Sequence, residues 1–283
     1  MRIAPTPSSG RPTHPAPAAA TSATARGGTL REGRWLGAVS VLAVLVGWGL
    51  LHSRRVVPDY LLPGPSDVFV TFVDILRNGY RETSLLQNAW STVYRCVAGF
   101  LLACLTGVPL GLAMGYSARI GAAFDYLIQF MRPLPPLSYL ILLILWLGTG
   151  NASKIALLYL TAFPIVVSSA MAGARSTKLQ RIQAARSLGA SETQVFRYVI
   201  LPSALPMAFT GARIALAAAF STVVAAELMA ATDGLGWMVF SASRFLRNDV
   251  IILGIFLLGI LGVLLNKLIL AVDGAIIHWR GVE

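Results

Sequence analysis

Two ionisable residues lie inside strongly apolar stretches of the sequence, and they are its clearest candidates for chemistry. Arg132 stands beside three prolines in MRPLPPLSY, and Glu227 stands in AAELMAATDGLGW. If such a stretch spans a membrane, a charged side chain in it is costly, and it usually lines a solute pathway or pairs with another polar group. Both residues are therefore candidates for a substrate pathway, with interhelical pairing as the alternative for each. Arg132 would supply a favourable potential for an anionic solute.

The residue types that catalysis or metal binding requires are not grouped in this sequence. Each lysine follows Ser, Thr or Asn, so the Gly-Lys-Ser/Thr phosphate loop is absent. The three histidines are scattered between the N-terminal region, the edge of an apolar stretch and the C-terminus, without the spacing of zinc ligands. No Gly-x-Ser-x-Gly nucleophile motif occurs. We therefore expect no catalytic residue, metal or cofactor in this chain, and a membrane enzyme is a remote alternative.

The composition indicates a membrane protein. Of the 283 residues, 56% are hydrophobic and only 12% are charged, against about 25% charged in a soluble globular domain. A bilayer-spanning helix needs about 20 mostly apolar residues. Candidate spans are Leu36–Leu51, Val93–Met114, Ala122–Leu147, Ile155–Met171, Ala208–Met229 and Val250–Val272. The sequence predicts an all-α membrane protein with about six transmembrane helices.

The net charge of +11 has two readings. A strongly basic surface is typical of nucleic-acid binding. In a membrane protein, however, Lys and Arg collect on cytoplasmic loops and set the orientation. More of them face the cytoplasm if both termini lie inside, although Arg54 and Arg55 argue against this orientation. We expect a multi-pass protein of the bacterial cytoplasmic membrane with both termini cytoplasmic and no nucleic-acid partner.

The N-terminal region differs from the rest of the chain. Residues 1–33 are rich in Pro, Ala, Ser, Thr and Arg, with no acidic residue before Glu32. Such a segment cannot bury enough apolar surface to offset its ordering entropy. Its small-residue run Ala18–Ala20 precedes the apolar stretch, whereas a signal-peptide cleavage site would follow it. We expect a disordered cytoplasmic tail at 1–33 and a transmembrane domain at 34–283.

Small residues and prolines indicate how the spans pack. Gly107, Gly111 and Gly115 recur every four residues, which lets two membrane helices approach closely. The fifth span is built largely from Ala, Ser, Thr and Gly, so we expect it at the centre of the bundle or at a subunit seam. The three prolines of MRPLPPLSY should interrupt the third span, against protein or a wet cavity.

A polar segment at about 175–206 separates two apolar spans. Its first part predicts a short helix from Lys178 to Leu188, with Ile182 and Ala185 at helical spacing. Gly189 can end this helix in a left-handed conformation.

The second part of the segment predicts another short helix. Ser191 stands three residues before Gln194, as in a capping box, and Pro202 and Pro206 should end the helix where the fifth span begins. The product is a polar hairpin on the inner face whose apolar stripe suits a groove on a soluble partner. A plain connecting loop is the alternative. A DNA-binding helix-turn-helix is disfavoured because both ends are tethered beside spans.

At this hairpin the chain resembles the integral-membrane permeases of bacterial ABC importers that depend on a binding protein. Their signature loop reads Glu-Ala-Ala, three residues, Gly, nine residues, Ile, one residue, Leu-Pro. The same spacing is filled here by Gln183, Ala184, Ala185, Gly189, Val199, Leu201 and Pro202. Gln183 replaces the glutamate and Val199 the isoleucine. The first change removes a charge that would meet a basic residue on the ATPase.

The resemblance extends over nearly all of the chain after the tail. The run AAELMAATDGLGW looks like the branch that carries sulfonates, taurine and nitrate, and most like taurine permeases. It implies a type I ABC importer permease fold that imports a small anion, with taurine or another sulfonate first and nitrate, bicarbonate or a pyrimidine precursor as alternatives. The implied partners are two ATPase subunits that bind ATP, a second permease copy in a homodimer, an extracytoplasmic substrate-binding protein and the lipid bilayer.

The resemblance also implies a role for the hairpin, which would transmit closure of the ATPase to the spans. The residues implied in ATPase coupling are Gln183, Ala184, Ala185, Leu188, Gly189, Ala190, Ser191, Leu201 and Pro202. An ATP-independent secondary transporter would require inverted repeats with broken helices in both halves. Only one span is broken by prolines here, so that class is a remote alternative.

Overall fold

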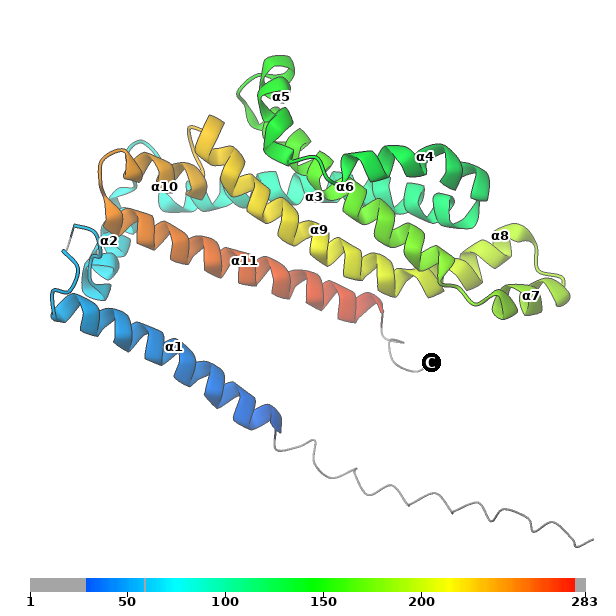
Figure 1. The fold of residues 1–283 in the computed structure, drawn as a ribbon, viewed down its shortest axis with the longest axis horizontal. Helices are drawn as coiled ribbons and strands as arrows, with labels where there is room; N and C mark the ends of the chain where they lie inside the picture. Colours follow the sequence, from blue (N-terminus) through cyan, green and yellow to red (C-terminus); the bar gives the residue numbers. More distant parts are fainter. Residues whose placement is uncertain (1–28, 59, 278–283) are drawn as a thin grey trace, which may run out of the picture. The chain divides into compact units, whose positions relative to one another are not determined.

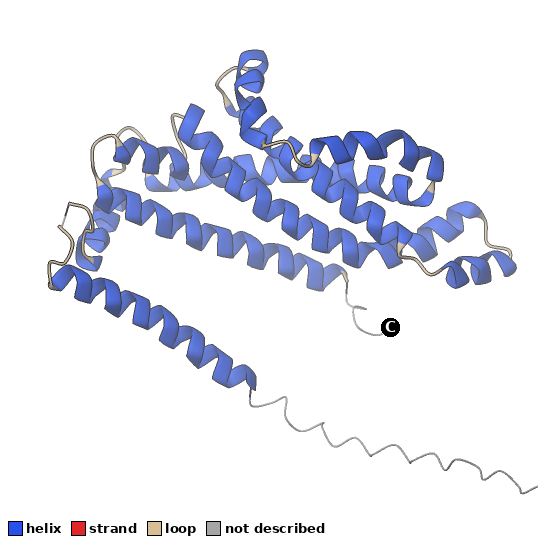
Figure 2. Cartoon of the chain, in the orientation of Figure 1, coloured by secondary structure: helices blue, strands red, loops and turns tan. Residues whose placement is uncertain are grey.

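The computed structural model describes residues 29–58 and 60–277, and within them every regular element is helical (Figures 1 and 2). The chain divides into two parts at Leu51. The first holds most of α1 (Thr29–Ser53), whose side chains from Val39 to Val44 are largely exposed and apolar. This helix begins inside the region expected to be a tail, and residues 1–28 lie outside the described part.

The second part contains all the other elements. They are α2 (Pro65–Asn78), α3 (Leu85–Tyr116), α4 (Ala118–Met131), the 3₁₀ turn η1 (Pro136–Tyr139), α5 (Leu140–Leu147), α6 (Asn151–Arg175), α7 (Leu179–Ser187), α8 (Glu192–Val195), the π-helical turn η2 (Phe196–Ile200), α9 (Leu201–Ala230), α10 (Leu235–Ser243) and α11 (Asn248–Ile276). Among the described residues, 4 helices are long and apolar enough to cross a membrane, or up to 5 if a bent pair is one span, besides the shorter apolar helix Val39–Ser53. This agrees with the expected count of about six.

The glycine stripe of α3 packs closely against another helix, as predicted, and the structure identifies that helix as α6. A Cβ added to Gly111 would lie 2.4 Å from the carbonyl oxygen of Val167, and one added to Gly115 would lie 2.5 Å from Cβ of Ala174. A Cβ added to Gly107 would lie 3.1 Å from Cγ1 of Val166. Without side chains at these points the two backbones come close enough to pack along their length.

The small-sided helix α9 lies at the centre of this bundle. Its Ala215, Ala219 and Ala226 are completely buried, and it contacts α6, α3, α10 and α11. The sequence predicted either the centre of the bundle or a subunit seam for this helix. Within this chain it lies at the centre of the bundle.

The prolines after Arg132 break the third span as expected. The axis turns by 92° between α4 and the helical segment Pro136–Leu147. Pro135 adopts an extended conformation, with φ −63° and ψ 123°, because the ring of Pro136 disfavours the helical region for the residue before it.

The predicted stop at Pro202 and Pro206 is wrong. The helix runs without interruption from Glu192 to Met229. The backbone N–H of Leu201 donates to the carbonyl of Phe196, five residues earlier, in the π-helical turn η2. Pro202 then falls in the first turn of α9, where its missing N–H is tolerated. Pro206 lies inside α9, as prolines can in membrane helices.

Candidate functional site

The turn between α7 and α8 is set by one left-handed residue. Gly189 has φ +83°, and its N–H donates to the carbonyl of Arg186 at 2.9 Å. The N–H of Ala190 donates to the carbonyl of Ala185 at 3.1 Å. These two bonds form a Schellman motif, which confirms the predicted glycine stop.

The next helix begins with the predicted capping box. The Ser191 N–H donates to Oε1 of Gln194 at 2.8 Å, and the Gln194 N–H donates to Oγ of Ser191 at 3.4 Å. Local hydrogen bonds therefore define both ends of the turn, and the hairpin projects at one end of the bundle (Figure 1).

The hairpin residues divide into two groups. Gln183, Ala184, Leu188, Gly189 and Ser191 are exposed, so they are available to a partner. The other four residues implied in ATPase coupling, which are Ala185, Ala190, Leu201 and Pro202, are half-buried. Three of them, Ala185, Ala190 and Leu201, pack against an apolar cluster that contains Val195 and Ile200.

The apolar stripe predicted on α7 is therefore divided. Ile182 and Ala185 pack onto the bundle, whereas Leu188 is 89% exposed. Only the end of the stripe is available to a partner, because the rest attaches the hairpin to its own chain.

A polar contact also joins the hairpin to α3. Arg186 Nε lies 2.9 Å from Oε1 of Glu192, and the hydroxyl of Tyr116 donates to the other carboxylate oxygen. The Tyr116 ring meets Phe196 edge-on at 5.6 Å. The sequence analysis missed Tyr116, since nothing in its local sequence marks a contact 76 residues away.

Arg132 lines a cavity of about 520 Å³ beside the broken span. Its guanidinium forms no hydrogen bond or ion pair with any residue that the structure describes. The hydroxyl-bearing residues around the cavity are Tyr139, Thr161, Ser168, Ser169 and Thr222. A guanidinium with free donors among hydroxyl groups is suited to an anion.

Glu227 is completely buried at the opposite end of the bundle from the hairpin. Its Oε1 lies 2.8 Å from Nη1 of Arg95, and it accepts hydrogen bonds from Thr92 Oγ1 at 3.0 Å and from the N–H of Gly236 at 2.9 Å. Glu227 therefore pairs with a residue of another helix, which is the alternative to a place in the substrate pathway. It lines neither the Arg132 cavity nor the second polar cavity, which lies at its own end of the bundle.

Arg95 is the centre of this buried cluster and is only 2% exposed. Its Nε donates to Asn151 Oδ1 at 2.7 Å, Nη1 donates to the carbonyl of Asp233 at 2.9 Å, and Nη2 donates to the carboxylate of Asp233. The cluster joins α3, α6, α9 and the α9–α10 loop. Arg95 carries the same signal as Glu227, an ionisable residue in an apolar stretch, and was missed although that signal could have found it.

The loop between α9 and α10 needs glycine at one position. Gly234 has φ +115°, and an added Cβ would lie 2.4 Å from Cδ of Glu227. The N–H of Gly234 donates to Oδ1 of Asn88 at 2.8 Å. The Asp-Gly-Leu-Gly run therefore folds directly over the buried carboxylate.

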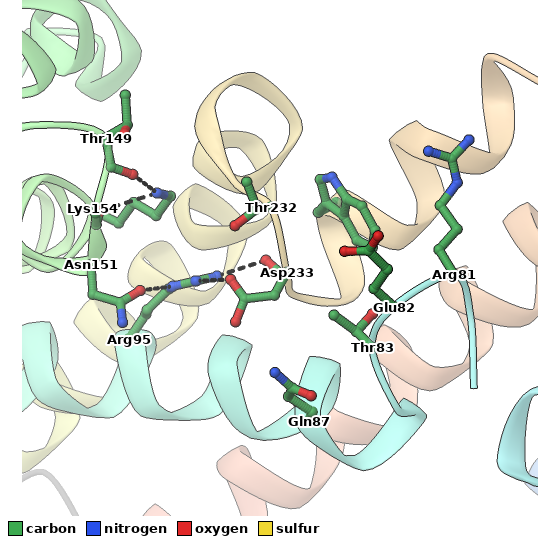
Figure 3. A pocket seen from close by; sticks show the side chains of 12 residues that line it. Arg81, Glu82, Thr83, Gln87, Arg95, Thr149, Asn151, Lys154, Thr232 and Asp233 are labelled. Carbon is green, nitrogen blue, oxygen red and sulfur yellow. Dashed lines mark hydrogen bonds and ion pairs between the residues drawn. The ribbon is translucent and has the colours of Figure 1, made fainter. Parts of the chain in front are cut away.

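A second polar cavity, of about 860 Å³, opens at this end of the bundle (Figure 3). Lys154 is only 2% exposed, and its Nζ donates to the carbonyls of Thr149 at 2.6 Å and Gly150 at 3.1 Å. The cavity is lined by Arg81, Glu82, Thr83, Gln87, Arg95, Thr149, Gly150, Asn151, Lys154, Thr232, Asp233 and Trp237.

Asp233 faces this cavity with 24% of its side chain exposed. Partial burial by itself would raise the pKa of Asp233, but hydrogen bonds from Ser91 and Arg95 and the charges of Arg95 and Lys154 hold it below its usual value. The carboxylate is therefore ionised at neutral pH.

Comparison with known protein families identifies the family of this chain. Residues 107–279, more than half of the chain, match the binding-protein-dependent transport system inner membrane component. The chain belongs to this family of ABC importer permeases. The permease is thus a multi-pass inner-membrane component, and its family implies ATPase and substrate-binding partners.

Several curated permeases are similar over most of their length. The taurine transport system permease protein TauC of Escherichia coli (strain K12) is 41% identical, over 86% of this chain and 89% of that protein. An aliphatic sulfonates transport permease protein SsuC of the same strain is 32% identical, over 82% and 86%. The nitrate import permease protein NrtB of Synechocystis sp. (strain PCC 6803) is 29% identical, over 85% and 88%. The permease is thus a member of the sulfonate, taurine and nitrate branch.

The fold of the permease matches that of a solved importer. A chain of the MetNI methionine ABC transporter in an inward-facing conformation aligns with a TM-score of 0.59 and 22% identity, covering 69% of this chain and 94% of that chain. This is the type I importer permease fold expected from the sequence. Such subunits are non-catalytic, so the permease itself is not an enzyme.

Proposed function

We propose that this permease carries a small sulfonate, most specifically taurine, into the cell. The observation that carries the proposal is Arg132, an unpaired guanidinium on a hydroxyl-lined cavity beside a broken span. A sulfonate is a compact anion with oxygen acceptors that such a group can bind. The 41% identity to a taurine permease supports the same choice.

The hairpin is the proposed contact with the ATPase. Two ATPase subunits would bind ATP and close on a pair of permease copies, a homodimer in this proposal. Closure can drive the spans only if the ATPase binds one conformation of the permease better than the other. The exposed residues Gln183, Ala184, Leu188, Gly189 and Ser191 offer the surface for that difference.

This role sets the orientation. The hairpin and both termini would lie in the cytoplasm, and the end of the bundle with Arg95 and Glu227 would face the substrate-binding protein. Because Gln183 is uncharged, contact with the ATPase would depend on shape and apolar area at Leu188 rather than on an ion pair there.

Reconstitution tests the proposal. The permease, its ATPase and its binding protein in proteoliposomes should take up labelled taurine only when ATP is supplied on the ATPase side. Excess alkanesulfonate, nitrate or bicarbonate in the same assay separates the alternatives. Uptake that continues without ATP would contradict the proposal of an ATP-driven importer. Uptake that is blocked by nitrate but not by sulfonates would indicate that the permease carries nitrate, as the name of its relative NrtB states for that protein.

A further inference from the structure

The cavity at the end opposite the hairpin differs from the Arg132 cavity in its charges. The residues around Arg132 include no carboxylate. The opposite cavity contains both signs, with Lys154 on one wall and Asp233 facing it (Figure 3). Glu82 and Arg81 lie farther along the same opening (Figure 3).

Lys154 occupies an unfavourable position for a cation. It stands in the first turn of α6, where the helix dipole is positive. It is almost completely buried, yet among the residues that the structure describes its ammonium bonds only to the carbonyl oxygens of Thr149 and Gly150. Carbonyls satisfy its donors without neutralising its charge, so Lys154 attracts an anion from the cavity.

Asp233 supplies the opposite charge. Its Oδ1 is paired with Arg95 and its Oδ2 accepts from the Ser91 hydroxyl, but 24% of the side chain is exposed and each carboxylate oxygen has a second lone pair for a ligand, whereas Glu227 is completely buried. Lys154 and Asp233 line one cavity but form no ion pair with each other among the described residues. Unused donors lie around Lys154, since the amide nitrogen of Asn151 and the hydroxyl of Thr149 form no hydrogen bond in the described part.

We propose that this cavity binds a zwitterionic aminoalkyl sulfonate, with its sulfonate on Lys154, Asn151 and Thr149 and its ammonium on Asp233. The inference rests on the proposed function and adds to it a binding site at the end of the bundle opposite the hairpin, together with the requirement that the sulfonate also carries a positive charge. A simple anion such as nitrate could contact Lys154 and its neighbours but would gain nothing from Asp233. The volume of about 860 Å³ leaves room for the hydration of such a solute.

Direct binding tests the proposal. Labelled taurine and isethionate, which has a hydroxyl in place of the ammonium, are titrated against the full-length permease in lipid nanodiscs. Taurine should bind about tenfold more tightly than isethionate. Asp233→Asn should weaken taurine binding by about the same factor and leave isethionate binding unchanged or tighter, because a partly desolvated charge pair contributes to one ligand only. Equal affinities for the two solutes would overturn the proposal.

Two further variants locate the site. Lys154→Gln, which keeps donors for the two carbonyls, should weaken the binding of both taurine and isethionate. This variant tests the site if the Asp233→Asn protein does not assemble. Asp74→Asn makes the same chemical change as Asp233→Asn at an exposed residue of α2 that does not line the cavity, and it should change neither affinity. A loss with Asp74→Asn equal to that with Asp233→Asn would refute the site.

The outcome also separates this inference from the proposed function. ATP-driven taurine uptake by the wild-type transporter, with nanodisc binding insensitive to Asp233 and Lys154, would overturn the inference alone. A folded, ATP-hydrolysing transporter that takes up no taurine would overturn the proposed function and the inference with it.

Discussion

Single residues determine the geometry at both ends of the bundle. At the hairpin, Gly189 sets the angle between α7 and α8, and no atom lies within 4 Å of an added Cβ. Any penalty for substitution there comes from its φ of +83° and not from crowding. At the other end, Gly234 has both a positive φ and the Glu227 carboxylate against it. The same residue type therefore serves two different physical requirements.

Gly189→Val should uncouple transport from ATP hydrolysis. A β-branched residue is strained in the left-handed region, by on the order of 1–2 kcal/mol, so the turn between the two short helices should open. Uptake and stimulation of the ATPase by the binding protein should fall while membrane insertion is unchanged. Gly189→Asn is the control, because Asn tolerates this conformation. Normal uptake and stimulation in the Val variant would contradict the role of the turn.

Arg132→Gln should raise the KM for taurine uptake by about tenfold, because it removes an unpaired cation from the proposed anion route. Arg132→Lys keeps the charge and should retain most of the affinity. Initial uptake rates over a range of taurine concentrations measure both variants. A Gln variant with wild-type rate and affinity would exclude Arg132 from the route.

At the scale of elements, buried charge joins three helices, α3, α6 and α9, to the α9–α10 loop. Arg95 and Glu227 come from α3 and α9, and Asn151 and Asp233 join α6 and the loop to them. Removing one partner of such a pair leaves an uncompensated buried charge, which typically costs about 3–5 kcal/mol. The cluster should therefore keep this end of the bundle rigid while the hairpin end moves.

Glu227→Gln should lower the thermal stability of the permease strongly, because it removes the completely buried partner of Arg95 and leaves only the partly exposed Asp233 to compensate that charge. Arg247→Gln is the matched control, since its ion pair with Asp249 is half-exposed and worth about 1 kcal/mol or less. Thermal unfolding of both variants in the same detergent measures the difference. Equal shifts in Tm would show that the buried cluster adds no stability beyond that of an exposed pair.

Gly111→Ala should separate α3 from α6. Its Cβ would lie 2.4 Å from the carbonyl oxygen of Val167, and neither backbone can give way without loss of packing. Gly259→Ala in α11 is the control, because nothing lies within 4 Å of its Cβ, and it should be neutral or slightly stabilising. The yield of folded protein after detergent extraction compares them. Similar yields would contradict the close approach of the two helices.

At the scale of the whole bundle, polar surfaces lie at separate levels. In the second part of the chain, the hairpin of α7 and α8 projects at one end (Figure 1). The cavity of Lys154 and Asp233 is lined by residues from the other end, and the Arg132 cavity lies beside the broken span. In the proposed function a solute would enter at the charged cavity and pass Arg132. ATPase closure at the hairpin would then act on α3 and α9, the helices to which Tyr116 and Leu201 attach it.

Features that depend only on neighbouring residues could be predicted from the sequence. Apolar length predicted the spans, Gly189 predicted the turn, and Ser191 with Gln194 predicted the capping box, because each of these structures is made by residues within a few positions. The glycine stripe predicted a packing face but not its partner, since only the folded bundle brings α6 against α3.

Tertiary structure decided the contacts between distant residues. Arg95 and Glu227 are 132 positions apart, and no local pattern shows that they pair. Packing against the Val195 cluster turned Ile182 and Ala185 inward and left Leu188 outside. The π-helical turn before Pro202 let the helix continue, because a shift in hydrogen bonding removed the break that the prolines alone predicted.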